Sequence, residues 1–298
     1  MNVLNPWPGD IVTVGASEAE LKRTQSLISV VQPKSHQEIS SLEQLAPILD
    51  ARSTEHPTLI RLFEDSHSKV LSWLGAGGRV SSEVAILGYA DAIYCEPSEP
   101  PRVVGVFADA FVAALSSMKI ACDTLSAALL IGACDETRAA AVGLARLGYK
   151  RIQVVDSDDE KTAKLIQILQ RRVFGVKFEA VSRASLTQLP NESSLAFNLM
   201  GESERALLED ASYLNFLQKA GIWIDWTGAT RALGYDEEIV DGGARVVEAA
   251  RIRAWREVFL LSLLGSEGAS PGQKPEQIAD RLMAQATPGK SPEELPPS

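Results

Sequence analysis

Residues 127–156 read AALLIGACDETRAAAVGLARLGYKRIQVVD and decide the fold of the second half of the chain. The unbroken apolar run at 127–131 is typical of a strand that is buried on both faces. Gly132 ends this run, the apolar spacing of 136–147 predicts a helix, and Gly148 stands where a helix C-cap is expected. A second apolar run follows. Strand, tight turn, helix and strand in this order predict a βαβ unit of the kind that binds a dinucleotide.

The same stretch predicts where such a ligand would bind. In a dinucleotide-binding unit the pyrophosphate lies on the N-terminus of the helix, and an acidic residue after the second strand accepts the ribose hydroxyls. The turn of Gly132, Ala133 and Cys134 precedes the predicted helix, and Asp156 follows the second predicted strand at 152–155. We therefore predict that these four residues bind the cofactor.

The turn departs from the glycine fingerprint of this unit. The fingerprint G-x-G-x-x-[GA] uses its second glycine to let the backbone approach the pyrophosphate, and Cys134 stands there instead. Asp135 and Glu136 add negative charge where phosphates would lie, although acidic residues also stabilise a helix N-terminus. Two interpretations stay open at this point: a weakened nucleotide site, or a βαβ unit that has lost its nucleotide.

Length, charge and cysteine content exclude several classes of protein. A chain of 298 residues suits one large or two medium domains. The formal net charge is −10 and no basic stripe is present, so a nucleic-acid surface is not expected. Three cysteines without a pairing pattern fit a reducing compartment. No apolar run reaches the about 20 residues of a membrane span, and no signal-peptide pattern begins the chain. We expect a cytoplasmic protein without a membrane partner.

The three histidines are His36, His56 and His67. They have no metal-ligand spacing, so we expect them to be surface or capping residues and expect no metal site.

Strands alternate with helices along the chain, which predicts an α/β protein of two domains with mostly parallel sheets. We expect an N-terminal α/β domain over 1–108, completed by a C-terminal helix over about 244–264. A Rossmann-like dinucleotide-binding domain is expected over 109–243. The segment 266–298 is rich in Gly, Ser, Pro and charge and is expected to be largely disordered, apart from a helix near 276–286.

This domain order and four motifs resemble the shikimate dehydrogenase family. VVGVFADAFVAAL at 103–115 is similar to the family motif L-x-G-x-N-T-D-G-x-G-F-x-x-A-L, and LAFNLMGE at 195–202 to a strand that ends in I-N-x-T. DGGARVVEAARIRAWREVF at 241–259 is similar to D-G-x-x-M-L-v-x-Q-A-x-x-x-F. The fourth motif is the glycine-poor turn quoted above. The resemblance is strongest over 103–158 and 192–264, and it implies an N-terminal substrate domain beside the Rossmann-like domain.

The resemblance implies roles for residues of the substrate site. Asp109 matches the family's catalytic aspartate. Lys69 is the best candidate for the catalytic lysine by its distance along the chain, although the lysine motif V-T-x-P-x-K has no clean match. Asp91 in GYADAI at 88–93 replaces a substrate-binding asparagine, and Glu248 replaces a substrate-binding glutamine. The paired serines that hold the substrate carboxylate in the family have no match.

The resemblance also implies residues of the cofactor site. Asn198 matches the asparagine beside the cofactor, and Gly243 matches a glycine of the last motif. The cofactor is expected to be NAD or NADP. Family members that use NADP carry a basic residue after the second strand, whereas this chain has Asp156, Asp158 and Asp159. Because carboxylates repel a 2′-phosphate, NAD is favoured.

Three functions remain open from the sequence. The first is an NAD(P)-dependent oxidoreductase of a cyclic hydroxy acid of the shikimate type, as in aromatic amino-acid biosynthesis, in which Asp109 would hold Lys69 as a proton donor. The second is a non-catalytic relative that serves as a sensor or assembly partner, which the altered motifs favour. The third is an unrelated Rossmann enzyme, such as a methylene-tetrahydrofolate or amino-acid dehydrogenase. We expect a small-molecule ligand and a possible homodimer. We also expect ordinary shikimate to bind weakly or not at all, because ionised Asp91, Glu248 and Asp109 only accept hydrogen bonds and repel an anion.

Overall fold

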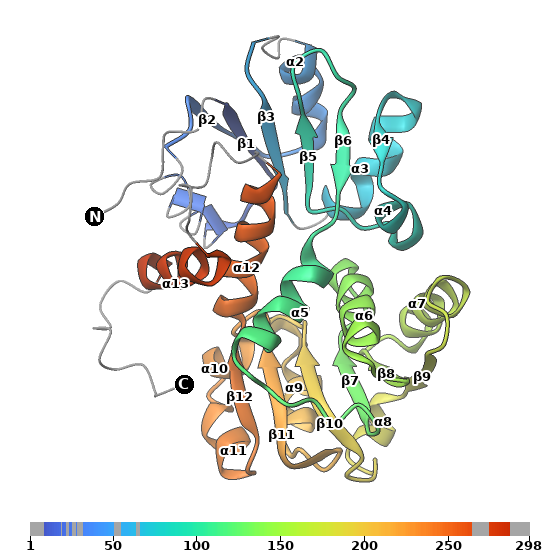
Figure 1. Ribbon diagram of the computed structural model, residues 1–298. Helices are drawn as coiled ribbons and strands as arrows, with labels where there is room; N and C mark the ends of the chain where they lie inside the picture. Colours follow the sequence, from blue (N-terminus) through green and yellow to red (C-terminus); the bar gives the residue numbers. More distant parts are fainter. Residues whose placement is uncertain are drawn as a thin grey trace. The chain divides into compact units, whose positions relative to one another are not determined.

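The computed structural model describes residues 9–18, 20–21, 24–25, 28, 32–50, 55–63, 66–263 and 274–286. The chain divides into two compact units (Figure 1). Unit 1 contains residues 1–118 and 253–298, and unit 2 contains residues 119–252. The divisions therefore fall after Met118 and after Ile252, later in the chain than the predicted boundaries at 108 and 243. No helix in the described part of the chain is both long and apolar enough to cross a lipid bilayer.

Unit 2 is built on a parallel sheet of six strands in the order β9-β8-β7-β10-β11-β12 (Figure 1). The strands are β7 (Ala127–Ile131), β8 (Arg151–Val155), β9 (Lys177–Val181), β10 (Ser193–Asn198), β11 (Leu217–Asp225) and β12 (Arg245–Glu248). The order reverses between β7 and β10, which makes the carboxyl ends of these two strands the topological switch point of the sheet. Ligands of open α/β sheets bind at such a point.

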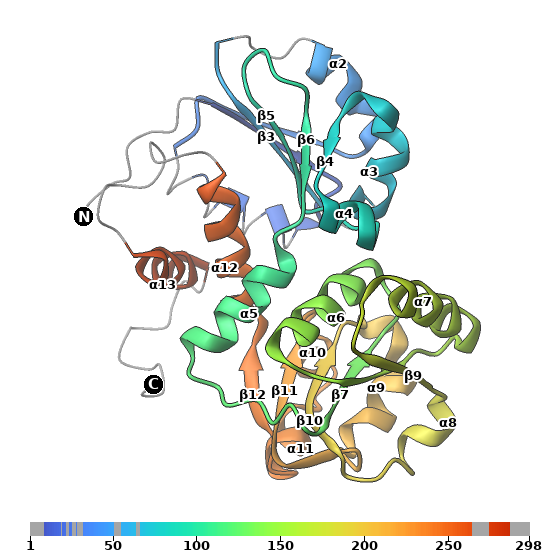
Figure 2. The ribbon, with the colours of Figure 1, turned by 45° about the vertical axis from the view of Figure 1, so that its right-hand side comes forward.

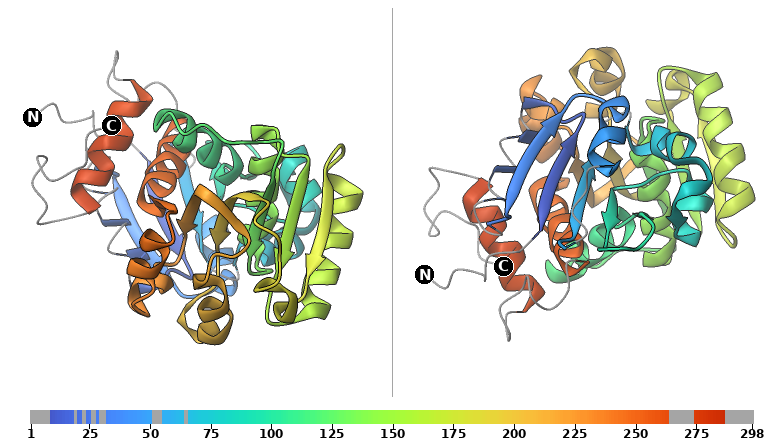
Figure 3. Two further views of the ribbon diagram at one scale, coloured as in Figure 1. Left: turned by 90° about the horizontal axis from the view of Figure 1, so that it is seen from below. Right: turned by 90° about the horizontal axis from the view of Figure 1, so that it is seen from above.

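Helices connect the strands of unit 2. They are α6 (Asp135–Leu147), α7 (Asp159–Arg172), α8 (Arg183–Leu186), α9 (Arg205–Ser212), α10 (Ala229–Ala232) and α11 (Asp236–Asp241). The predicted βαβ unit is confirmed as β7, α6 and β8, and Gly148 caps α6 in a left-handed conformation with φ of 107°. Figure 3 shows α7 beside β9 at one end of the sheet. Trp223 and Phe216 lie in a core of apolar side chains that includes Leu129 and Met200.

Unit 1 contains a mixed sheet of six strands in the order β2-β1-β3-β5-β6-β4. The strands are β1 (Asp10–Val14), β2 (Ser35–Ile39), β3 (Thr58–Leu62), β4 (Arg79–Val80), β5 (Ala92–Cys95) and β6 (Arg102–Val104). β5 runs antiparallel to both of its neighbours, β3 and β6. The sheet is therefore less parallel than the sequence predicted.

The helices of unit 1 come from both ends of the chain. They are α2 (Leu45–Asp50), α3 (Ser66–Leu74), α4 (Ser82–Leu87), α5 (Phe107–Ser117), most of α12 (Ala249–Ser262) and α13 (Pro275–Ala286). Figure 2 shows α2, α3 and α4 on one side of the sheet and α12 on the other. The short 3-10 turns Leu42–Gln44 and Gly75–Gly77 flank α2 and α3.

One prediction about the C-terminal part needs correction, and the helix expected near 276–286 is confirmed as α13. The helix expected from residue 244 begins at Ala249, because Arg245–Glu248 forms β12 and pairs with β11. This pairing keeps the segment before 253 in unit 2. Within the predicted tail, α13 buries Ile278 and Leu282 and is therefore packed, while residues 266–273 and 287–298 lie outside the described part of the chain.

Candidate functional site

Gly132 forms the turn at the switch point. Its φ is +112°, and its N–H donates to the carbonyl of Val155 at 2.7 Å, which ties the end of β7 to the end of β8. A Cβ at this position would lie 2.5 Å from Met200 Sδ. Both the backbone conformation and the packing therefore require glycine here.

Asp156 contacts this turn through its carboxylate. Its Oδ2 accepts the N–H of Ala133 at 2.6 Å, and its Oδ1 accepts the N–H of Asp158 at 3.0 Å and the hydroxyl of Ser157 at 3.3 Å. The residue is only 2% exposed, and Lys161 Nζ lies 3.8 Å from Oδ2. The structure thus brings together three of the predicted cofactor residues, Gly132, Ala133 and Asp156, around one carboxylate.

Cys134 is the N-cap residue of α6 and lies in a closed hydrogen-bond system. Its N–H donates to Thr137 Oγ1 at 3.1 Å, and the Thr137 hydroxyl donates to the carbonyl of Gly132 at 2.8 Å. Burial, together with the charge of Glu136, raises the pKa of the Cys134 thiol to about 12. The side chain is therefore a neutral thiol near pH 7 and not an activated nucleophile.

Asn198 lies at the end of β10, on the other side of the switch point, and is fully buried. Its Oδ1 accepts the N–H of Met200 at 3.0 Å, and its Nδ2 donates to Asp225 Oδ1 at 2.9 Å. The side chain therefore shapes the strand end, and both of its polar atoms already have protein partners.

Asp225 was missed by the sequence analysis and organises the adjacent strand end. Its carboxylate accepts the N–H of Gly228 at 3.1 Å and the N–H of Thr230 at 2.9 Å, in addition to Asn198. Asp225 and Thr230 belong to the segment DWTGAT, in which an acidic residue ends a strand and a threonine follows five positions later. This spacing was the available signal, because Asp and Thr side chains commonly bind the backbone of such turns.

Glu248 and Gly243 lie at opposite ends of β12. Glu248 is exposed at the carboxyl end, in register with Asp225. The pKa of Arg231 is raised first by the hydrogen bond that Arg231 donates to Asp236, and the charge of Glu248 adds to this effect. Gly243 has φ of 85° and precedes the strand, where its carbonyl accepts the N–H of Ala220. Gly243 thus serves a turn at the amino end of the sheet, away from the other predicted cofactor residues.

The two predicted catalytic residues lie on helices of unit 1. Lys69 is exposed on α3, and its charge, after the hydrogen bond from Ser41, helps to lower the pKa of Glu43. Asp109 is exposed in the first turn of α5, where the helix dipole stabilises an acidic residue. Their action as a pair stays a prediction.

Asp91 differs from its predicted role in contact with substrate. The residue is fully buried, and its Oδ2 accepts the N–H groups of Val106 at 2.6 Å and Phe107 at 2.9 Å. Its Oδ1 accepts the hydroxyl of Tyr89 at 3.0 Å and lies 2.7 Å from Arg256 Nε. Three hydrogen bonds and the Arg256 cation therefore occupy both oxygens of this carboxylate inside unit 1.

His67 was expected at the surface and is 2% exposed instead. Its Nδ1 lies 2.7 Å from the carbonyl of Ala90, and its ring stacks on Tyr89 with centroids 4.7 Å apart. The burial was not visible in the sequence because the residue lies among polar neighbours in EDSHSK. Among the described residues, no group of three or more His, Cys, Asp or Glu side chains could hold a metal ion.

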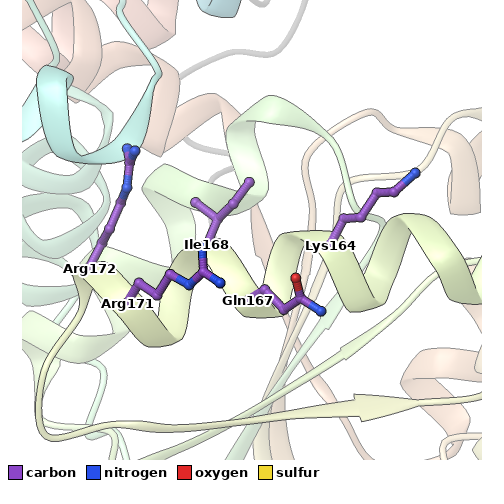
Figure 4. A pocket seen from close by; sticks show the side chains of 5 residues that line it. All are labelled: Lys164, Gln167, Ile168, Arg171 and Arg172. Carbon is purple, nitrogen blue, oxygen red and sulfur yellow. The ribbon is translucent and has the colours of Figure 1, made fainter.

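A hollow on α7 lies apart from the residues predicted for the site. Figure 4 shows its lining of Lys164, Gln167, Ile168, Arg171 and Arg172. These residues are three, four or one apart and form one stripe of the helix, and the Lys164 ammonium is 2.7 Å from Glu160. The stripe is a solvated helix face.

Comparisons with known proteins agree with this architecture. No protein-family model and no curated protein sequence matches the chain. A shikimate dehydrogenase of Mycobacterium tuberculosis superposes with a TM-score of 0.71 at 15% identity and covers 93% of this chain and 100% of its own. Quinate dehydrogenase from Corynebacterium glutamicum, solved with NAD, gives a TM-score of 0.74 at 12% identity over 93% of this chain and 99% of its own. Shikimate 5-dehydrogenase from Thermus thermophilus, solved with NADP(H) and shikimate, gives 0.66 at 16% identity over 93% and 99%. The chain has the two-domain α/β fold of the shikimate and quinate dehydrogenases, with unit 2 as its Rossmann-like domain.

Proposed function

We propose that this chain binds a nicotinamide dinucleotide at the carboxyl edge of the unit 2 sheet and does not reduce 3-dehydroshikimate. The observation that carries the proposal is the pair of carboxylates Asp156 and Asp91. Asp156 lies beside the Gly132 turn at a switch point, where a ribose would be accepted. Asp91 stands at the position that resembles a substrate-binding asparagine and is fully engaged inside unit 1.

The residues at the switch point fit the adenosine half of a dinucleotide. Asp156 Oδ2 accepts a hydrogen bond from Ala133, and a carboxylate oxygen has room for a second donor such as a ribose hydroxyl. Lys161, whose side chain is 50% exposed, lies 3.8 Å away and marks the side of the carboxylate that is nearest to solvent.

The N-terminus of α6 fits the pyrophosphate less well. Backbone N–H groups of a first helical turn have no partner within the helix, so those of Asp135 and Glu136 are the donors a phosphate would use. The carboxylates of the same two residues oppose an anion. Arg138 lies 3.5 Å from Asp135 and offsets part of that charge. We therefore expect weaker binding than in a site with the full glycine fingerprint.

The cofactor preference follows from the end of β8. Asp156 follows β8, Asp158 caps α7 and Asp159 begins it, and the negative charge of these three residues disfavours a 2′-phosphate. NAD(H) is therefore expected to bind in preference to NADP(H). When bound, the nicotinamide supplies hydride chemistry, and the chain's own residues would supply binding and orientation.

A second candidate is an oxidoreductase of another cyclic hydroxy acid. It is favoured by the exposure of both Lys69 and Asp109, since a proton donor and the carboxylate that orients it must reach a substrate. The non-catalytic alternative, a sensor or an assembly partner, uses the same dinucleotide site without turnover.

Ligand-induced thermal shift separates these functions. A ligand that binds only the native state stabilises it by about 2.7 kcal/mol at 100 times its Kd, so NAD should raise the melting temperature more than NADP does. An Asp156→Asn variant should lose the preference between the two. A shift with neither nucleotide would refute the binding proposal. Turnover of shikimate with either nucleotide would refute its second part, and turnover of another cyclic hydroxy acid would support the second candidate.

A further inference from the structure

The chain passes between the compact units at two places, and both are adjacent to helices that contact one buried carboxylate. The first crossing follows Met118, just after α5 ends, and the second lies between Ile252 and Arg253, within α12. Asp91, the residue before β5, contacts the start of α5 and a side chain of α12.

Asp91 is itself held rigidly by unit 1. Its backbone N–H donates to the carbonyl of Val104 at 2.9 Å, and its carbonyl accepts the N–H of Leu62 at 3.0 Å. The side chain is therefore anchored between β3 and β6. From this position Oδ2 accepts the N–H groups of Val106 and Phe107, which are donors that the start of a helix leaves without an intrahelical partner.

Arg256 connects the same carboxylate to α12. Its Nε lies 2.7 Å from Asp91 Oδ1, and its Nη2 donates to the carbonyl of Leu62 at 3.1 Å. The guanidinium lies 5.4 Å from the ring centroid of Phe63, within the range of a cation–π contact. Burial opposes the charge of Arg256, but Asp91, Tyr89 and the other neighbouring acidic groups together outweigh it, so the pKa of Arg256 is raised. The two ions thus depend on each other in a buried site.

A second ion pair of opposite polarity fixes the register of α12. Glu257, the neighbour of Arg256, pairs with Arg61 of β3. A shift of α12 by one residue would bring Arg256 to Arg61, and like charges in a buried site are strongly unfavourable. The two ion pairs together therefore favour a single register of α12 against β3.

A third contact joins α12 to the far end of α5. Trp255 Nε1 donates to Ser117 Oγ at 3.2 Å, and Trp255 is only 5% exposed. α5 is therefore connected to α12 near both of its ends, through Asp91 at the N-terminus and through Ser117 at the C-terminus.

We propose that the Asp91–Arg256 ion pair couples the position of α5 to the position of α12. Local opening of one of these helices would then open the other, and the two chain crossings would become mobile together. This coupling between α5 and α12 does not depend on the proposed function, since it involves no ligand. One consequence concerns Asp109, which belongs to the first turn of α5, two residues after Phe107, whose N–H donates to Asp91.

Hydrogen exchange of the full-length chain, followed by mass spectrometry, tests the coupling. The variant Arg256→Gln removes a charge from α12 and changes no residue of α5. Exchange should rise by about a hundredfold or more in α5 as well as in α12, because removing one partner of a buried ion pair leaves the other charge unpaired and lowers the free energy of local opening. Arg79→Gln is the matched control, since it removes an exposed ion pair with Glu99 at 3.1 Å in the same unit and should change neither helix.

The outcomes are distinct. A rise confined to α12 would overturn the proposal, and so would an equal rise throughout β1 and β3, which would indicate general loss of stability. If Arg256→Gln does not fold, Arg256→Lys keeps the charge with fewer donors and should show a smaller rise in the same two helices. Failure of both variants to fold would assign the pair to overall stability and would also overturn the coupling.

Discussion

The substitution Gly132→Ala tests the geometry of the switch point. The residue has φ of +112°, and an added Cβ would lie 2.5 Å from Met200 Sδ and 3.1 Å from Met200 Cγ. Met200 is 8% exposed and belongs to the core that also contains Trp223, so its side chain has little free space into which it can move. The variant should therefore be strained in both its backbone and its packing.

The expected loss has two parts. An L-residue in the left-handed region costs about 1–2 kcal/mol. Overpacking a filled site costs about 1–3 kcal/mol. Gly132→Ala should therefore lower the free energy of unfolding by about 2–5 kcal/mol. Gly234→Ala is the matched control in the same unit, because its φ is +81° and no atom lies within 4 Å of its Cβ position, so it should lose only the backbone part.

Urea unfolding, followed by tryptophan fluorescence, measures these losses. The double variant Gly132→Ala, Met200→Ala should be more stable than the sum of the single variants by about 1–3 kcal/mol, since the shortened side chain removes the clash. Additive effects within about 0.5 kcal/mol, or equal losses in Gly132→Ala and Gly234→Ala, would refute the assignment of Met200 as the neighbour that excludes a side chain here.

Three further predictions concern the same edge of the sheet. Thr137→Val should lower the free energy of unfolding by about 1–3 kcal/mol in thermal unfolding, because it removes the hydroxyl that bridges Gly132 and Cys134, whereas Thr187→Val, at an exposed position, should have little effect. Because burial raises the pKa of Cys134 from 9.0 to about 12, its thiol favours the native state below pH 9, and this contribution is lost as the pH rises toward 12. The stability of Cys134→Ala should therefore fall less steeply than that of the unmodified chain as the pH rises above the ordinary thiol pKa of 9.0, and equal slopes would contradict the burial. Asp225→Asn should weaken the 227–230 turn, seen as faster hydrogen exchange at Gly228 and Thr230, and unchanged exchange there would show that the carboxylate does not hold the turn.

Much of unit 2 could be predicted from the sequence because its signals are local. The run 127–131 is apolar without interruption, and Gly132 and Gly148 stand at the two ends of the helix. The three predicted elements of this βαβ unit agree with β7, α6 and β8 within one residue. The strand at 245–248 could not be separated from the following helix, because Val246 and Val247 fit either pattern until β11 supplies a partner. The two glycines before it were the available sign of a break.

The candidate site was harder to predict because it depends on contacts between distant parts of the chain. The resemblance placed Asp91 opposite a ligand, and no local pattern reveals that Arg256 and the start of α5 are its partners. No local pattern reveals the contact of Asp156 with Ala133 either, because it joins the end of β8 to the end of β7. Residue type and position along the sequence indicate where a polar group lies, but they do not indicate whether its hydrogen-bonding capacity is already used.

Whether a carboxylate already has buried partners decides how much free energy a ligand would lose in contacting it. Removing one partner of a buried ion pair typically costs about 3–5 kcal/mol. A ligand that used Asp91 would have to separate it from Arg256 and from two helix N–H groups, and its own contacts would have to exceed that cost before any net binding remained. Asp156 also accepts three hydrogen bonds, but its cation is Lys161, which lies 3.8 Å away with a side chain that is 50% exposed, so a ribose hydroxyl would compete with a solvated partner and not with a buried ion pair. Under the proposed function, we therefore expect ligand binding at the carboxyl edge of the unit 2 sheet, whereas the Asp91 carboxylate is committed to contacts within unit 1.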